Sequence, residues 1–315
     1  MCDKMKKYLI FTVASLLLMP SCLTKKEKPG ELTRTSGEVK LVTLDPGHFH
    51  AALVQKNSYK QVADEVYVYA PEGDDVQEHL NKINGYNTRT DSPTKWKEVV
   101  YLGSDFLEKM LSEKKGNVMI TAGNNGKKTE YIKQTLMAGI HVLADKPMAI
   151  NSENFGLLKE CFDIARGKGI LLYDIMTERH EITTVLQREL SCIPAVYGEQ
   201  LKGTPEEPAI VKESVHHFFK VVSGTPLKRP AWFFDVNQQG EGIVDVMTHL
   251  VDLVQWEAFP EQVIDYTQDI ELLDANRWTT SISPEEFKQV TGTDAYPDFL
   301  KKDVENDTLK VYCNG

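Results

Sequence analysis

Short apolar runs, typical of buried strands, alternate with longer stretches of helical periodicity in the first half of the chain. Strands that alternate with helices predict a parallel, doubly wound sheet. Ligands of such sheets bind beyond the carboxyl ends of the strands, so the loops there are the first candidates for a site. The predicted strands span residues 39–44, 65–70, 99–102, 117–121, 141–144 and 169–174, and the predicted helices span 105–115, 127–138 and 152–168.

The pattern changes after residue 176. We expect a helix over 181–192 and strands over 197–202, 211–222 and 308–313. The prediction is therefore an α/β protein, with a Rossmann-like, doubly wound parallel sheet over residues 39–176. An α+β domain with a mainly antiparallel sheet is expected over residues 177–315. Asn314-Gly315 is a strong hairpin-turn signal, so we expect this second domain to be incomplete at its C-terminus.

Residues 1–22 have the pattern of a secretory signal. Lys4, Lys6 and Lys7 precede an apolar run over 8–19, which is too short for a comfortable membrane span. Ser21-Cys22 then resembles a lipoprotein cleavage site, which predicts lipidation of Cys22. Residues 23–38 are expected to be a flexible tether. We therefore expect an exported lipoprotein, anchored in a membrane and facing the periplasm or the cell surface.

Composition excludes several other classes of protein. The chain of 315 residues is 41% hydrophobic and 26% charged, which is ordinary for a globular protein with room for two domains. The formal net charge of −10 and the lack of a long basic cluster argue against a nucleic-acid partner. Cys161, Cys192 and Cys313 have no metal-knuckle spacing, and a disulfide framework is not indicated. Whether the protein is a homo-oligomer stays open.

The stretch over 240–256 carries the first candidate chemistry. If it is one helix, Asp245, His249 and Asp252 share a face, among apolar neighbours that imply burial. A carboxylate one turn before an imidazole can fix its tautomer and suit it to proton transfer. A buried Asp–His pair satisfied by backbone groups is the alternative, and the stretch alone does not decide between them.

Two motifs resemble the Gfo/Idh/MocA oxidoreductase family. AGIHVLADKPMAI over 138–150 is similar to that family's AGKHVLxEKPxA motif, and the sequence over 229–256 is similar to its segment ending in GGGxxxDxxxHxxDxxxW. They occur in the family's order and at about its spacing, and the resemblance covers residues 39–259. The region beyond it resembles the C-terminal part of an exported lipoprotein branch of the Bacteroidota.

This resemblance implies a nicotinamide dinucleotide, NAD or NADP, in the first domain and a sugar, cyclitol or sugar derivative as substrate. It makes Lys146, His249 and Asp245 the catalytic candidates. His249 would be the general base, Asp245 its orienting partner, and Lys146 the cation that stabilises charge on the reacting oxygen. The resemblance and the loop positions together give the cofactor-binding candidates Gly47, His48, Phe49, Glu72, Asn125, Lys146 and Pro147.

The loop after the first strand departs from the family's pattern. A dinucleotide fold of this kind has GxGxxG there, whereas Asp45, Gly47 and His50 occupy the three glycine positions. Asp45 would place a carboxylate near the pyrophosphate, which is unfavourable by charge. Ala70 stands where an acid would contact the ribose, and Glu72 follows two residues later.

Three functions remain open. The first is an NAD(P)-dependent oxidoreductase, for which oxidation of a sugar carbon could also be a step in glycosidic cleavage. The second is a non-catalytic carbohydrate-binding lipoprotein on a degenerate Rossmann fold. The third is a metal-dependent hydrolase that uses His48 and His50. Further ligands would then come from His216, His217, His249 and Asp245. For the oxidoreductase no metal ligand is expected.

Overall fold

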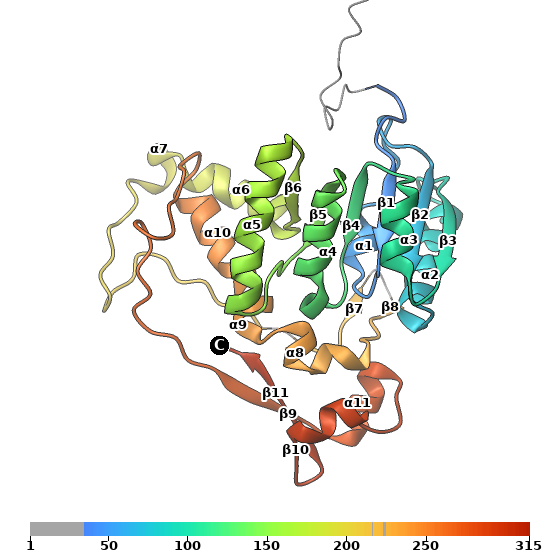
Figure 1. Ribbon diagram of the computed structural model, residues 1–315. Helices are drawn as coiled ribbons and strands as arrows, with labels where there is room; N and C mark the ends of the chain where they lie inside the picture. Colours follow the sequence, from blue (N-terminus) through green and yellow to red (C-terminus); the bar gives the residue numbers. More distant parts are fainter. Residues whose placement is uncertain (1–34, 216, 223–224) are drawn as a thin grey trace, which may run out of the picture.

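The computed structural model describes residues 35–315 except 216 and 223–224 (Figure 1). The predicted signal segment, Cys22 and most of the predicted tether lie outside the described residues and stay predictions. Within the described part of the chain, no helix is both long and apolar enough to cross a membrane.

A six-stranded parallel sheet forms the first half of the protein, which confirms the predicted fold (Figure 1). Its order, β3-β2-β1-β4-β5-β6, reverses direction between β1 and β4, and ligands of such sheets bind beside this reversal. Every pair of neighbouring strands runs parallel. The strands are β1 (Leu41–Leu44), β2 (Glu65–Ala70), β3 (Lys97–Leu102), β4 (Val118–Thr121), β5 (His141–Asp145) and β6 (Leu172–Ile175).

Helices cover both faces of this sheet (Figure 1). One hydrophobic core joins side chains of α3, α4 and α5 to one face, and a second joins α1 and α2 to the other. Because both faces are covered, all four residues of β1 are buried, as is usual for a central parallel strand. The helices are α1 (His50–Leu53), α2 (Asp74–Thr88), α3 (Phe106–Glu113), α4 (Asn125–Met137) and α5 (Ser152–Lys168).

The second half is an α+β unit with a three-stranded antiparallel sheet of order β10-β11-β9, as predicted. A cluster of aromatic and aliphatic side chains, including Phe234, Phe287 and Leu309, packs beneath it. Its elements are η1 (Glu178–His180), α6 (Ile182–Ser191), α7 (Pro194–Tyr197), β7 (Val221–Val222), β8 (Thr225–Pro226), η2 (Ala231–Phe234), α8 (Val236–Gln239), α9 (Gly242–Asp245), α10 (Met247–Ala258), β9 (Trp278–Ile282), α11 (Pro284–Thr291), η3 (Asp298–Asp303), β10 (Val304–Glu305) and β11 (Thr308–Asn314).

Two predicted strands of this half are wrong. Residues 198–202 form neither helix nor strand, and among the described residues of 211–222, which leave out 216, only Val221–Val222 is a strand. Val211 and Val215 are 75% and 76% exposed, so the apolar side chains of this alternating segment do not pack against a core. A strand is stabilised by neighbouring strands in a sheet, and the described part of this segment has none along most of its length.

The predicted helix over 240–256 is also divided, because α9 ends at Asp245 and α10 begins at Met247. The hydroxyl of Thr248 donates to the carbonyl of Val244 at 2.6 Å. This carbonyl would otherwise accept a regular backbone hydrogen bond from residue 248, and such side-chain competition bends or interrupts helices.

Candidate functional site

A cavity of about 670 Å³ lies at the carboxyl ends of β1 and β2. The first half contributes the loop that includes Gly47 and the β2–α2 loop with Glu72. The second half contributes Lys228, Arg229 and Trp232. The cavity therefore lies between the two halves, at the edge of the sheet where ligands of this fold bind.

The loop after β1 is tied down by hydrogen bonds of its own. The backbone N–H groups of Gly47 and His48 both donate to the carbonyl of Ala122, at 2.9 Å each. Asp45 has a φ of 47°, a left-handed conformation that glycine adopts more easily, at the first glycine position of the family's loop. Its carboxylate accepts a hydrogen bond from Tyr131 at 2.9 Å, and burial raises its pKa.

Trp232 of the second half covers this loop. A Cβ on Gly47 would lie 2.7 Å from the indole ring, so a larger residue would displace it. The indole N–H donates to the Asp75 carboxylate at 2.7 Å. Burial raises the pKa of Asp75 to about 6, although the bond from Trp232 opposes this shift.

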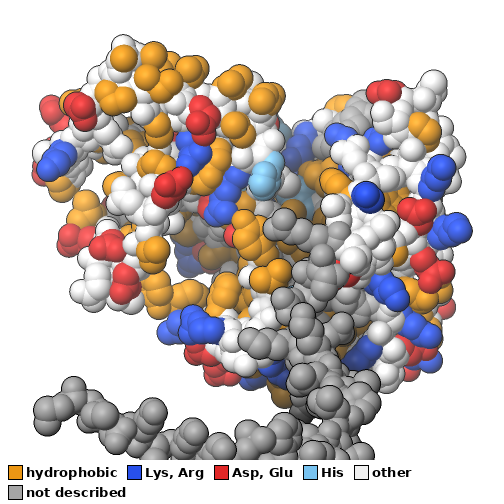
Figure 2. Space-filling model, turned by 90° about the horizontal axis from the view of Figure 1, so that it is seen from above, with side chains coloured by type: hydrophobic (Ala, Val, Ile, Leu, Met, Phe, Trp, Pro, Cys, Tyr) orange, Lys and Arg blue, Asp and Glu red, His pale blue; other side chains and the backbone are white. Residues whose placement is uncertain are grey.

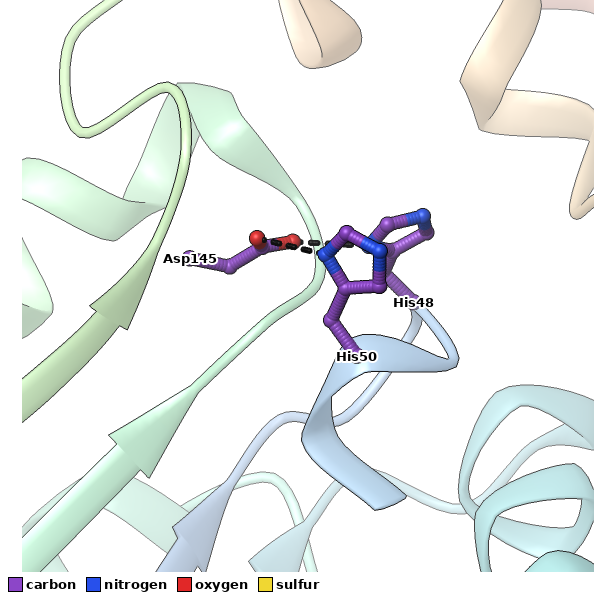
Figure 3. Close-up of side chains that lie close together, drawn as sticks. All are labelled: His48, His50 and Asp145. Atoms are coloured by element: carbon purple, nitrogen blue, oxygen red, sulfur yellow. Dashed lines mark hydrogen bonds and ion pairs between the residues drawn. The ribbon is translucent and has the colours of Figure 1, made fainter. Parts of the chain in front are cut away.

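His48, His50 and Asp145 form a cluster at the tips of β1 and β5 (Figure 3). Nδ1 of His48 lies 2.7 Å from one oxygen of Asp145, and Nδ1 of His50 lies 2.9 Å from the other. Burial lowers the pKa of His48 to about 3, so this imidazole is neutral. Burial alone would raise the pKa of Asp145, but the two imidazoles hold it well below its usual range. The third member, Asp145, was missed because the sequence motif drew attention to Lys146 beside it.

Lys146 lies against Asp245 of the second half. Its Nζ is 2.6 Å from Oδ1 of Asp245, and the two side chains are only 10% and 8% exposed. The sequence assigned Asp245 to orient His249, whereas in the structure its carboxylate forms an ion pair with Lys146. The helix break at Val246 separates Asp245 from the helix that carries His249.

The carboxylate beside His249 comes from Glu178, which sequence reasoning missed. Oε2 of Glu178 lies 2.6 Å from Nδ1 of His249, in an ion-pair contact that is not aligned as a linear hydrogen bond. Burial opposes ionisation of Glu178, but the contact with His249 outweighs it and lowers the pKa to about 2. Asp252, the third residue of the predicted face, pairs with Arg179 instead.

Lys220 is a second residue that the sequence gave no reason to select. Burial lowers its pKa, and the charges of Lys146, Asp245 and Glu178 all act on it. Its ammonium lies over the ring of Phe49, 5.9 Å from the centroid. Lys220 therefore lies beside the β1 loop, and the charges of the Lys146–Asp245 pair and of Glu178 affect its ammonium group.

Asn125 braces the two halves and does not line the cavity. Its side-chain N–H donates to the carbonyl of Gln239 at 2.7 Å, and its oxygen accepts from Lys128. Lys128 also donates to the carbonyls of Asp145 and Pro147, at 3.0 and 3.1 Å. Burial lowers the pKa of Lys128 to about 8.

The cavity fits a dinucleotide in position and size, since small-molecule sites have volumes of roughly 300–1,000 Å³. Glu72 lies on its wall and can accept from ribose hydroxyls, and Lys82 and Lys228 are cations of the lining. Arg229 is buried, and its guanidinium donates to the carbonyls of Phe218 and His217. The loop N–H groups that usually hold the pyrophosphate are taken by Ala122. The residues present therefore fit this group in position and volume, whereas the carboxylates of Asp45, Asp74, Asp75 and Glu78 on the same wall do not favour the pyrophosphate charge.

The fold is a Rossmann-like domain followed by an α+β domain, with a cavity between them. Residues 48–173 match the family described as "Oxidoreductase family, NAD-binding Rossmann fold", and residues 186–315 match the "Putative oxidoreductase C terminal domain". These matches confirm the resemblance to the Gfo/Idh/MocA oxidoreductase family that the motifs showed. A comparison with curated proteins gave no match.

Among solved structures, the chain is similar to a "putative oxidoreductase" from Parabacteroides merdae ATCC 43184, at 79% identity and a TM-score of 0.85. The match covers 89% of this chain and 64% of that one, so this chain spans less than two thirds of that relative. A "putative oxidoreductase" from Thermotoga maritima matches at 14% identity and a TM-score of 0.49, covering 78% of this chain and 62% of that one. The second likeness is too distant to carry an argument.

Proposed function

We propose that this chain is the catalytic part of an NAD(P)-dependent oxidoreductase that acts on a hydroxyl group of a sugar, cyclitol or sugar derivative. The observation that carries the proposal is the buried ion pair of Lys146 and Asp245 at 2.6 Å. It places a cation from the tip of β5 against a carboxylate of the second half. Buried charges are costly unless they are paired or used, and this pair lies at the edge of the sheet where ligands bind.

Side chains of the cavity would hold the dinucleotide. Glu72 would accept hydrogen bonds from a ribose, and Lys82 and Lys228 would be the cations for the phosphates. Gly47 and Phe49 would line the same cavity. When bound, the nicotinamide supplies the hydride chemistry of the reaction.

Lys146 and His249 would manage the charge and the proton of the substrate hydroxyl. The Lys146 ammonium, held by Asp245, can donate to the reacting oxygen and stabilise negative charge on it. The imidazole of His249 can take the hydroxyl proton, and the carboxylate of Glu178 beside Nδ1 stabilises the imidazolium that results. Glu178 would thus have the role that the sequence gave to Asp245.

The same surroundings support a polyol as the class of substrate. Lys146 and Lys220 offer donors, and Asp245 and Glu178 offer acceptors, within one charged neighbourhood. Several hydroxyl groups on one small molecule match such a mixture of donors and acceptors. Export through the signal segment and anchoring at Cys22 remain part of the proposal, because those residues lie outside the described ones.

The test is turnover of a panel of sugars and cyclitols with NAD and NADP, followed by absorbance of the reduced nicotinamide. Lys146→Met should lower kcat/KM by about 10²–10³-fold, because it removes a charge that acts on the developing oxyanion. His249→Gln should lower kcat/KM by about 10²–10⁴-fold through loss of the base. Dinucleotide binding, measured by quenching of tryptophan fluorescence, should persist in the His249 variant.

Lys133→Met is the matched control, since Lys133 pairs with Glu160 on the outer helices α4 and α5 and should not affect turnover. Unchanged turnover in the Lys146 or His249 variant would overturn the assigned roles. If the protein bound sugars but neither dinucleotide, the proposal would fail, and the non-catalytic carbohydrate-binding function would be favoured.

A further inference from the structure

We propose that His48, His50 and Asp145 bind one divalent transition-metal ion, beside the dinucleotide cavity. The three side chains offer two imidazole nitrogens and a carboxylate oxygen, all within 4.8 Å of one another. They come from the β1–α1 loop and the tip of β5, two segments that parallel pairing through β4 brings to one edge of the sheet. This ligand set is separate from the residues assigned to the proton and to the dinucleotide phosphates.

The geometry must adjust to hold an ion, because the ligand atoms lie within 4.8 Å of one another and not at one uniform spacing. Ligands of tetrahedral Zn²⁺ lie about 2.0–2.1 Å from the metal, and therefore roughly 3.4 Å from one another. The nitrogens of His48 and His50 lie 2.7 and 2.9 Å from the oxygens of Asp145. An ion between them would push these atoms apart by roughly half an ångström. His48 can give way, because its side chain is 22% exposed on a short loop.

Metal binding would replace the two hydrogen bonds to Asp145 by bonds from the same three side chains to the ion. A neutral imidazole that moves its proton from Nδ1 to Nε2 presents a lone pair at Nδ1. Figure 3 shows the second nitrogen of each ring on the side away from Asp145. Among the described residues, neither Nε2 has a hydrogen-bond partner, so a proton there disturbs no existing bond.

Nearby positive charges are already neutralised or bound. The ammonium of Lys146 pairs with Asp245 at 2.6 Å. Lys128 donates to Asn125 and to two backbone carbonyls, one of which belongs to Asp145 itself. The hydrogen bond from Lys128 to the Asp145 carbonyl restrains the backbone of Asp145, whose carboxylate faces His48 and His50 of the β1–α1 loop.

Two imidazoles and one carboxylate are a donor set used by zinc and by non-haem iron sites, with positions left for water or a ligand. His48 also lines the cavity. The remaining coordination positions can therefore be taken by water or by an oxygen of a bound ligand on that side.

The test is titration of the metal-free, untagged full chain with Zn²⁺ by calorimetry, and with Co²⁺ by visible absorption. We expect one ion per chain and the absorption bands of Co²⁺ in a low-symmetry site. Asp145→Asn keeps the size of the side chain but removes its charge, and should weaken Zn²⁺ binding at least about 100-fold. His50→Gln should have a similar effect.

His79→Gln is the matched control, because His79 is a buried histidine of the same domain outside the cluster. It should leave affinity and stoichiometry unchanged, and circular dichroism will show whether each variant is folded. The proposal is overturned if the unaltered chain binds no ion at micromolar Zn²⁺. It is equally overturned if folded Asp145→Asn and His50→Gln chains bind the ion as tightly as the original.

Discussion

Glu98 on β3 is a carboxylate whose charge is poorly solvated. The side-chain amide of Gln55 donates to it at 2.6 Å, but Gln55 is itself completely buried. Burial raises the pKa of Glu98 from 4.5 to about 7, although the bond from Gln55 opposes the shift. Between these two values the folded chain binds more protons at this position than the unfolded chain. The free energy of unfolding should therefore fall as the pH rises through this window.

Replacing the Glu98 carboxyl group by an amide should remove this fall in the free energy of unfolding at higher pH. Glu98→Gln keeps an oxygen for the Gln55 amide and should raise the free energy of unfolding at about pH 8 by on the order of 2 kcal/mol. At about pH 5 the variant and the original chain should be nearly equal, because Glu98 is then largely protonated. Urea unfolding at both pH values measures this difference.

Glu305→Gln is the control for the loss of a carboxyl group, since Glu305 is exposed on β10. It should leave the pH dependence unchanged. An equal gain in both variants, or none in Glu98→Gln, would contradict the role assigned to burial.

Sequence motifs identified individual residues of the site but did not predict which of these residues contact one another. Lys146 and Asp245 were both selected, but their direct pairing was not predicted, because the sequence suggested one continuous helix. Glu178 and Lys220 lie in segments without a motif, and only the folded chain brings them to the site. The approach of Asp145 to the two histidines likewise depends on sheet order, which no local pattern contains.

At the level of elements, two glycines differ in the space around them: one could accept a side chain, and the other is packed against backbone atoms. Gly156 lies within α5, and a Cβ there would meet no atom within 4 Å. Gly123 follows β4, and a Cβ there would lie 2.3 Å from the carbonyl oxygen of Asp45. The loop after β1 can therefore lie against β4 only because residue 123 has no side chain.

Alanine at these two positions should have opposite effects on stability. Gly156→Ala should raise the free energy of unfolding by about 0.5–1 kcal/mol, because alanine loses less conformational entropy in a helix. Gly123→Ala should lower it by about 2 kcal/mol or more, because backbone atoms must move. Thermal unfolding followed by circular dichroism measures both changes. A neutral Gly123→Ala would show that the two loops are not in close contact.

Element prediction succeeded where periodicity and burial agree. β1, β4 and β5 were found because apolar runs at the centre of a parallel sheet are buried on both faces. The edge strands β3 and β6 were found from short apolar runs that the structure leaves partly exposed. The segment over 211–222 has a similar local pattern but stays largely exposed, so local pattern alone gave a false strand. The division between α9 and α10 rests on one hydroxyl bond and has no counterpart in hydrophobic periodicity.

Across the whole molecule, polar contacts join the two halves. Lys146–Asp245 and Trp232–Asp75 are two of these contacts. Within the second half, Arg179 of η1 forms a bidentate ion pair with Asp252 on α10, and it also lies 3.9 Å from Asp174 of β6. The Arg179 and Asp252 side chains are 25% and 11% exposed, so solvent screens this pair less than a surface one. Figure 2 shows apolar side chains on the outer surface of the protein. The exposed apolar residues of α6 and α7 include Ile182, Leu186, Val196 and Tyr197.

Loss of one charge from the partly buried Arg179–Asp252 pair should weaken the contact between η1 and α10. Asp252→Asn should lower the free energy of unfolding by about 1–3 kcal/mol, because the guanidinium of Arg179 loses its main partner. Urea unfolding measures the change. Asp298→Asn is the matched control, since Asp298 pairs with Lys301 on the surface and is 95% exposed. If both variants lose the same stability, the pair does not contribute more than a surface contact.

The shared contacts of Asp145 restrict how this protein can diverge from its relatives. A GxGxxG pattern at positions 45–50 would replace His50 by glycine and leave the buried Asp145 carboxylate without one of its two imidazole partners. Replacing Asp145 first would instead leave two imidazoles facing a side chain that cannot carry their hydrogen bonds in the same way. In either order of substitution, the first change leaves a buried polar group without a hydrogen-bond partner. Substitutions in the loop and at the tip of β5 are therefore expected to occur together in evolution.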